Sequence, residues 1–272
     1  MISLLRMYNN MISRKKWFEE NGIVENKDKM PPRLTIAYTY YNEPELLKEQ
    51  IKLWEDYPPG VEIMVIDDGS EEYPAYDILK DVYFTYGVNF QLWKVARDLG
   101  FNSHGCRNLA AKYAPTDQIC FLDIDMRLNP GDVGHLRRIA MNPKTIYRFN
   151  MYAVFKKQWY PYPGHINCFI VNKDTFWEAG GYDESYTGHH YGDRPFHKEL
   201  DKLTKQANTG LTLNNYRTGR KMVTDYGLAD DTIMPVYDNV EMKIKYPGEI
   251  PDFDAMANTL KSKLNFPFVR LM

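Results

Sequence analysis

The stretch QICFLDID, residues 118–125, places a short apolar run directly before two aspartates that stand two positions apart. A run of this length is typical of a buried strand, and Asp123 and Asp125 follow it. On an extended backbone, side chains at i and i+2 point to the same side. Both carboxylates are therefore expected to face one divalent cation or the phosphates around it, and such oxygen ligands suit Mg²⁺ or Mn²⁺. Acidic residues also cluster in turns, where they cap backbone groups, so the rest of the chain must decide between these roles.

The sequence before this stretch predicts strands that alternate with helices. Strands are expected at residues 34–38, 61–66, 88–92 and 118–122. Helices are expected at residues 42–54, with Asn42 as the cap, and at 76–86 and 102–113. This alternation predicts a Rossmann-like α/β fold, in which a mainly parallel sheet is flanked by helices and binds ligands beyond the carboxyl ends of its strands. The polar segments at these ends should meet at one rim; they are residues 39–42, 67–70 and 123–125.

The sequence after the two aspartates predicts further elements of both kinds. Strands are expected at residues 145–155 and 166–171. Helices are expected at residues 131–141, 174–181 and 193–206, the second of them closed by two glycines. The remaining sequence carries weaker patterns.

The composition is that of a globular protein without a dominant charge. The 272 residues are 44% hydrophobic and 14% aromatic, which provides material for a sizeable core. With 34 basic and 36 acidic residues the net charge is -2, so no overall field attracts the chain to nucleic acid or to an anionic membrane.

Cysteines and apolar runs indicate the compartment. Cys106, Cys120 and Cys168 form no Cys-x-x-Cys pair, which indicates reduced thiols in a cytosolic protein. Residues 1–30 lack the apolar core and the cleavage site of a signal peptide. No apolar run approaches the roughly 20 residues that span a bilayer. We therefore expect a cytoplasmic protein without integral membrane association.

Four motifs stand in the order and spacing of a known family. They are TYYNE at residues 39–43, DDGS at 67–70, GCRN at 105–108 and LDID at 122–125. On these motifs the chain resembles the family-2 glycosyltransferases, nucleotide-sugar-dependent enzymes with the GT-A fold. The resemblance covers about residues 34–196.

The resemblance also implies a domain organisation. The GT-A domain is expected at residues 31–215, with a nucleotide-sugar half at about 31–130 and an acceptor half at about 131–215. A helical N-terminal extension, residues 1–30, and a C-terminal extension, residues 216–272, flank it.

For the nucleotide, the resemblance implies a base pocket at the ends of the first two strands. Tyr41 would offer an aromatic face to a uracil ring, and Asp68 an acceptor for its N3 hydrogen. Thr39 would close this pocket, and Asn42 and Glu43 belong to the same motif. The structural alternatives are core packing for Tyr41 and a turn role for Asp68.

For the diphosphate, the resemblance assigns roles to the GCRN segment. Arg107 would neutralise part of the pyrophosphate or help to hold the base, and Gly105 would let the backbone pass closely. The structural alternative for Arg107 is a surface arginine on a helix.

For the metal, the resemblance implies unequal roles for the two aspartates. Asp125 would coordinate Mn²⁺ or Mg²⁺, while Asp123 would contact the ribose or lie in the outer shell of the metal. His189 and His190 are favoured to complete the shell, because they are near Asp193 in sequence. His165 and His197 are further candidates. Zinc binding by His104 and Cys106 is not expected, because no further ligands have suitable spacing.

The catalytic base is expected in the acceptor half. The segment AGGYDE, residues 179–184, matches a family motif and is followed by YGDR at 191–194. The family's usual Glu-Asp pair is here Gly192-Asp193, which leaves Asp193 as the candidate base. Its structural alternative is a helix N-cap.

The resemblance thus implies a metal-dependent transferase that moves a sugar from a UDP-sugar, or another nucleoside diphosphate sugar, to an acceptor hydroxyl with inversion. The acceptor could be a glycan, a lipid carrier, a protein or a small molecule. A hydroxylated base in phage DNA is another possibility, with phosphate contacts from basic residues: Arg217, Arg220, Lys221, Lys261, Lys263 and Arg270. A catalytically inactive nucleotide-sugar-binding protein is a third reading. A nucleotidyltransferase is a fourth, against which stands the lack of a glycine-rich phosphate loop after the first strand.

Overall fold

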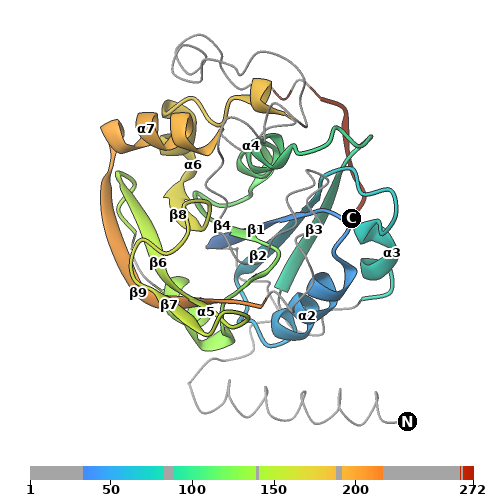
Figure 1. The fold of residues 1–272 in the computed structure, drawn as a ribbon, viewed down its shortest axis with the longest axis horizontal. Helices are drawn as coiled ribbons and strands as arrows, with labels where there is room; N and C mark the ends of the chain where they lie inside the picture. Colours follow the sequence, from blue (N-terminus) through green and yellow to red (C-terminus); the bar gives the residue numbers. More distant parts are fainter. Residues whose placement is uncertain (1–32, 83–87, 139–140, 188–191, 217–263, 265) are drawn as a thin grey trace.

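The computed structural model describes residues 33–82, 88–138, 141–187, 192–216, 264 and 266–272 (Figure 1). The expected N-terminal helical extension and most of the expected C-terminal extension lie outside these residues. The described residues form one ten-stranded sheet with helices on both faces.

The parallel part of the sheet confirms the predicted strands. β1 (Leu34–Tyr40) pairs in parallel with both β2 (Val61–Asp67) and β4 (Gln118–Asp123), and β2 pairs in parallel with β3 (Val88–Val95). β1 and β2 are buried along nearly their whole length, as expected of strands covered on both faces.

The helices cover the two faces of this sheet with separate cores. α2 (Pro44–Trp54) and α3 (Ala75–Leu79) lie on one face, where Tyr38 of β1 packs against Trp54 at a ring separation of 5.2 Å. α4 (Ser103–Tyr113) lies on the other face, where Ala37 belongs to the same core as Leu109. Neighbouring residues of β1 thus face opposite cores, as the alternation of side chains along a strand requires.

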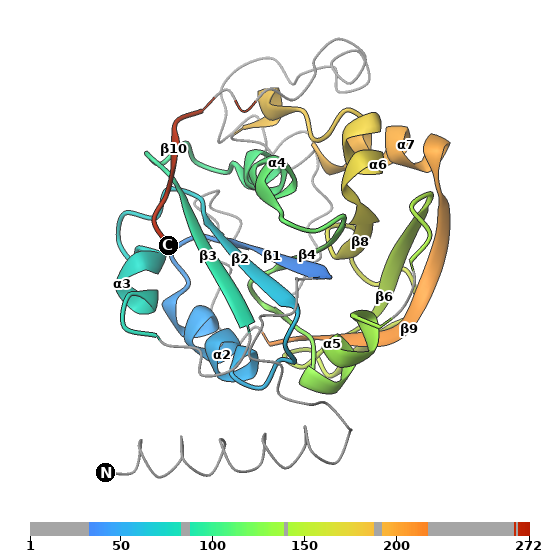
Figure 2. The ribbon, with the colours of Figure 1, turned by 180° about the vertical axis from the view of Figure 1, so that it is seen from behind.

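The second half of the chain extends the same sheet beyond β4 (Figure 2). β8 (Phe169–Asn172) pairs antiparallel with β4 and with β6 (Thr145–Ala153), and β9 (Lys205–Asn215) runs parallel to β6. The remaining short strands are β5 (Met126–Arg127), β7 (Gln158–Tyr160) and β10 (Phe268–Arg270). The remaining helices are α5 (Pro130–Leu136), α6 (Lys173–Glu178), α7 (Asp193–Leu203) and the 3₁₀ turn η1 (Glu184–Tyr186).

Several predicted boundaries were wrong. The helix expected at 193–206 ends at Leu203, and the long strand β9 that follows it was not predicted. β9 is partly exposed over most of its length and contains Gly210, so its apolar alternation is weak, and its main partner β6 is distant in sequence. The helix expected at 76–86 ends at Leu79 in the described residues, and the one expected at 131–141 ends at Leu136.

The start of α2 and the C-terminal segment also differ from the prediction. Asn42 does not cap α2, because Glu43 is the N-cap residue and Asn42 has a positive φ of 47° before it. The apolar C-terminal segment is not merely a weak pattern, since β10 pairs antiparallel with β3 and forms the edge of the sheet. Among the described helices, none has both the length and the apolar composition needed to cross a bilayer.

Gly69, in the DDGS turn after β2, is predicted to be far less replaceable than Gly100. Both have positive φ, 77° and 71°, but a Cβ on Gly69 would lie 2.5 Å from the Arg97 carbonyl oxygen, while one on Gly100 would meet nothing within 4 Å. Gly100→Ala should lower the free energy of unfolding by about 1–2 kcal/mol through backbone strain. Gly69→Ala should lower it by about 1–3 kcal/mol more, because of the added overlap. Urea denaturation of both variants measures the difference, and equal losses would contradict the importance of the close approach.

Candidate active site

The polar segments predicted to share a rim lie together at the carboxyl ends of the parallel strands. Thr39 is in register with Ile66 of β2 and with Asp123 of β4. The backbone N–H of Asp68 donates to the Tyr40 carbonyl at 2.8 Å. The order of the strands therefore brings together three motifs that are distant in sequence.

The residues predicted to line the base pocket are accessible at this rim. Thr39, Tyr41, Asn42 and Glu43 are all partly exposed, so none is sealed in a core. The Tyr41 hydroxyl donates to Asp98 Oδ2 at 2.6 Å, a partner that the sequence analysis did not identify.

Asn42 joins the first motif to the second. Its backbone N–H donates to Ser70 Oγ at 3.0 Å, and its Oδ1 accepts from the Tyr73 N–H at 2.9 Å. The positive φ of Asn42 is a conformation that asparagine adopts more readily than most residues. This residue therefore shapes the rim through its backbone as well as its side chain.

Asp68 is a buried carboxyl group in which only one of the two oxygens accepts a well-formed hydrogen bond. Its Oδ2 accepts from the Asn102 N–H at 2.9 Å, whereas its Oδ1 is buried without a well-formed hydrogen bond in the described structure. Burial raises the pKa of Asp68 to about 8, against the lowering effects of the Asn102 N–H and the Cys106 thiol. A buried polar atom without a partner is costly, so a ligand N–H at this oxygen would be favourable.

Arg107 connects the motif aspartate to the candidate base. Its Nη2 donates to Asp123 Oδ1 at 2.6 Å, and its Nη1 donates to Ser103 Oγ at 3.1 Å and lies 4.0 Å from Asp193 Oδ1. Arg107 is only 2% exposed, so the surface-arginine alternative is wrong. Burial disfavours its charge, but the neighbouring carboxylates, first Asp123, raise the pKa of Arg107.

Gly105 has a packing role in α4. A Cβ at this position would lie 2.4 Å from Asn102 Oδ1 and 2.6 Å from the Phe266 ring. The first turn of the helix therefore packs closely on its own cap residue and on the chain segment before β10.

Asp193 is the first residue of α7, and its carboxylate has partners from two other parts of the chain, α4 and the segment before β8. Asn167 Nδ2 donates to Asp193 Oδ2 at 3.0 Å, and His104 Nε2 lies 3.4 Å from Oδ1. Burial would raise the pKa of Asp193, but His104, then Arg107 and Asn167 hold it well below its usual range. The cap alternative for Asp193 is wrong, because the N-cap residue is Gly192.

Gly192 explains why the usual Glu-Asp pair is absent. A Cβ on Gly192 would lie 2.8 Å from His104 Nε2. The fully buried His104 ring thus occupies the space that a glutamate at position 192 would need. The place of His104 beside Asp193 is not predictable from the sequence, in which His104 stands out only as a neighbour of Cys106.

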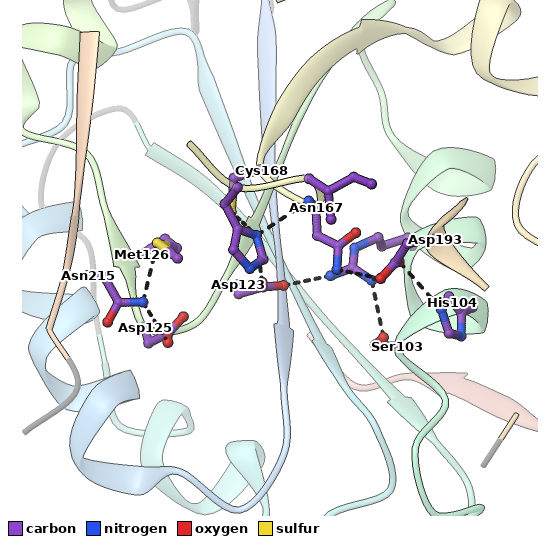
Figure 3. A network of polar contacts seen from close by, with 12 residues as sticks. Ser103, His104, Asp123, Asp125, Met126, Asn167, Cys168, Asp193 and Asn215 are labelled. Carbon is purple, nitrogen blue, oxygen red and sulfur yellow. Dashed lines mark hydrogen bonds and ion pairs between the residues drawn. The ribbon is translucent and has the colours of Figure 1, made fainter. Parts of the chain in front are cut away.

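The two motif aspartates have different neighbours, contrary to the expectation of a shared side. β4 ends at Asp123, and Ile124 and Asp125 form a turn, so the rule for extended backbone no longer applies. Asp125 is 3% exposed, and its Oδ2 accepts from Asn215 Nδ2 at 3.0 Å. Figure 3 shows Asp125 with Asn215 and Met126, apart from the row formed by Asp123, Asp193 and His104.

A group of possible metal ligands lies around Asp123. Its carboxylate, His165 and Cys168 bring their ligand atoms within 4.8 Å of one another, and no other such group of three occurs in the described residues. The set fits a divalent cation, since it offers an oxygen, a nitrogen and a sulfur atom. Burial, then Asp123, raises the pKa of the Cys168 thiol.

Of the other candidate histidines, only His197 is among the described residues, and it is not part of this group. His197 Nδ1 lies 3.1 Å from Arg148 Nη2, and burial, then Arg148, lowers the pKa of His197 to about 3. His189 and His190 lie outside the described residues. Of the basic residues named as DNA contacts, only Arg270 is described, where it lies over the Trp93 ring of β3.

The sequence pattern of the glycosyl transferase family 2 matches residues 35–204. The chain belongs to this family. No curated protein matches the chain in sequence.

Solved structures of glycosyltransferases share the fold of this family 2 protein. Residues 1–349 of TarS from S. aureus align with a TM-score of 0.56 at 14% identity, covering 67% of this chain and 60% of that one. The same part of TarS in complex with UDP gives 0.54 with the same identity and coverage. The mannosyltransferase PcManGT from Pyrobaculum calidifontis, in complex with GDP-Man and Mn²⁺, gives 0.55 at 14% identity, covering 80% of this chain and 68% of that one. The predicted GT-A fold is therefore confirmed.

Asp68→Asn is predicted to remove a pH dependence of stability from the family 2 protein. The folded pKa of Asp68 is about 8, and an unfolded aspartate has about 3.9. Between these values the folded state keeps a proton that the unfolded state has lost, so the free energy of unfolding falls as pH rises, by up to about 1.4 kcal/mol per pH unit. The variant keeps an oxygen for the Asn102 N–H but cannot titrate.

Urea denaturation of the parent and the variant at about pH 5 and at about pH 8 measures this effect. The parent should lose more stability than the variant over that interval. Identical pH dependences would show that Asp68 is ionised in the folded protein.

Proposed function

We propose that this family 2 glycosyltransferase moves a sugar from a nucleoside diphosphate sugar, a UDP-sugar in the first place, to an acceptor hydroxyl with inversion and with a divalent cation. The observation that carries the proposal is the position of Arg107. One buried guanidinium contacts Asp123, at the strand end where the donor is expected, and lies beside Asp193, the candidate base. One side chain, Arg107, thus lies close both to the expected donor site and to the candidate base.

We assign the nucleobase of the donor to the rim formed by the ends of β1 and β2. Tyr41, held by Asp98, provides an aromatic ring that is partly exposed. Asp68 Oδ1 is a buried acceptor without a well-formed hydrogen bond, which would suit the N3 hydrogen of uracil. Thr39, Asn42 and Glu43 are the remaining candidates for contact at this rim.

The diphosphate is assigned to the end of β4. A bound Mn²⁺ or Mg²⁺ would offset charge on the departing nucleoside diphosphate, so that the leaving group needs no proton donor. Asp125 and Asp123 are the candidate ligands, and His189 or His190 are candidates to complete the shell. Arg107 donates to one oxygen of Asp123 only, and the other oxygen lies 3.5 Å from His165 Nδ1.

We assign to Asp193 the role of the base that takes the proton of the acceptor hydroxyl. The depressed pKa of Asp193 means that the carboxylate is ionised at neutral pH, as a general base must be. Asn167 and His104 fix the orientation of the group from two sides. An activated hydroxyl that displaces the nucleoside diphosphate in one step would invert the anomeric centre.

Asp193→Asn is predicted to stop transfer but not donor binding. An amide of the same shape cannot take the acceptor proton, and loss of a general base costs about 10²–10⁴-fold in rate. Product formation should therefore fall by this factor, while UDP affinity measured by calorimetry stays within a few-fold.

Asp201→Asn is a matched control, since Asp201 lies on the same helix and is exposed. It should transfer sugar at the parental rate. A parental rate in Asp193→Asn itself would eliminate Asp193 as the base.

Asp125→Asn is predicted to abolish metal-dependent turnover with the fold intact. The new amide oxygen can still accept from Asn215, but a neutral ligand binds a hard cation weakly. Turnover with Mn²⁺ or Mg²⁺ should fall at least about a hundredfold, because a bound metal supplies several kcal/mol of charge stabilisation. Steady-state rates over a range of metal concentrations test this expectation.

The matched control is Asp117→Asn, because Asp117 is exposed and directly precedes β4 at its opposite end. It should leave the rate and its metal dependence unchanged. Unchanged turnover in Asp125→Asn would rule out this residue as the metal ligand.

A further inference from the structure

The side chains around Asp123 combine three kinds of metal ligand in one place. Asp123 Oδ2 lies 3.5 Å from His165 Nδ1, and the same nitrogen lies 3.5 Å from Cys168 Sγ. The three ligand atoms all lie within 4.8 Å of one another. His165 and Cys168 come from the segment that leads into β8, the antiparallel partner of β4.

These separations match the edges of a tetrahedral zinc site. Bonds of about 2.1 Å to nitrogen and oxygen and about 2.3 Å to sulfur place N and O about 3.4 Å apart, and N and S about 3.6 Å apart. Both observed distances are 3.5 Å. Two of the three edges of such a site are therefore matched, and the oxygen and the sulfur lie within 4.8 Å of each other.

His165 Nδ1 has a polar neighbour besides Asp123 and Cys168. The Asn167 backbone N–H donates to this nitrogen at 3.3 Å, a long hydrogen bond to the lone pair that a cation would use. A carboxylate oxygen faces the same nitrogen, so a cation between the two atoms would be attracted to both and would replace the Asn167 N–H.

The surroundings of Asp123 and Cys168 hold the ligands in position. Arg107 Nη2 donates to Asp123 Oδ1 at 2.6 Å, and Asp123 Oδ2 faces His165. Such contacts to the second oxygen of a ligand fix its orientation. Cys168 is 1% exposed and directly precedes Phe169, which pairs with Phe121 of β4.

The cluster is open on one side. The side chains of His165 and Asp123 are 32% and 24% exposed, while Cys168 is buried. Three protein ligands with an accessible fourth position are typical of zinc sites that bind water or a substrate atom.

We propose that Asp123, His165 and Cys168 form a binding site for a thiophilic divalent cation, Zn²⁺ in the first place. Sulfur and imidazole ligands favour Zn²⁺ and Co²⁺ over Mg²⁺, which prefers an all-oxygen shell. On binding, the Cys168 thiol releases its proton to solvent and coordinates as the thiolate. The site shares Asp123 with the proposed transferase, but it needs neither donor nor acceptor.

Cobalt titration of the full chain, stripped of metal by a chelator, tests the site directly. Co²⁺ should bind with one equivalent and produce the sulfur-to-cobalt charge-transfer absorption and the visible bands of tetrahedral cobalt. Zn²⁺ should displace it and Mg²⁺ should not. Cys168→Ser should lose the charge-transfer absorption, and His165→Ala should weaken binding by about tenfold or more.

Two matched controls should keep the parental spectrum. Cys120→Ser removes another buried thiol, from β4, and His135→Ala removes an exposed histidine from α5. Thermal unfolding of every variant shows whether it is folded before titration.

The absence of a sulfur-to-cobalt absorption in the parent protein would overturn the proposal without reference to any variant. A folded Cys168→Ser variant with the parental spectrum would also overturn it. The proposed transferase is tested separately. Sugar transfer without the cobalt signal would sink this site alone, and the signal without transfer from any donor would sink the transferase alone.

Discussion

The buried guanidinium of Arg107 is the constraint on which the arrangement of the site depends. A cation that is almost fully removed from water is stable only with close opposite charges and hydrogen bonds. Asp123 provides one charge from the end of β4, and Asp193 another from the start of α7. Because β4 belongs to the parallel part of the sheet and α7 to the second half of the chain, the contacts of Arg107 hold α7 against the parallel sheet.

The same constraint explains the unusual residues beside Asp193. A carboxylate that is largely buried needs more than one partner, and His104 and Asn167 complete the set that Arg107 begins. His104 can approach only because Gly192 has no side chain. The departure from the usual Glu-Asp pair is therefore a local exchange, in which an imidazole from α4 fills the space next to Asp193.

The sequence was sufficient where structure depends on local pattern, and insufficient where it depends on distant partners. β1, β2 and β4 were predictable because their buried apolar runs end in polar motifs, and the order of the strands placed Asp68 near Asp123. β9 was missed because its exposed residues carry little alternation. Asp125 does not share a side with Asp123 as expected, because a turn replaces the extended backbone after Asp123. Its partner Asn215 belongs to β9, the strand that was not predicted. Cys168 was read as an ordinary thiol because its neighbour Asp123 lies on another strand.

Arg107 also links the pKa of Asp193 to the end of β4, because the same guanidinium contacts Asp123. As it stands, the guanidinium contributes to holding the pKa of Asp193 well below its usual range, and so weak a base removes a hydroxyl proton poorly. Any ligand at the end of β4 that draws Arg107 further toward Asp123 weakens its attraction on Asp193, and the pKa of Asp193 then rises, although His104, the larger cause, still holds it below its usual range. The distances of 2.6 Å and 4.0 Å already show which carboxylate holds the guanidinium more closely. The geometry thus ties part of the basicity of Asp193 to the occupancy of the opposite side of the site.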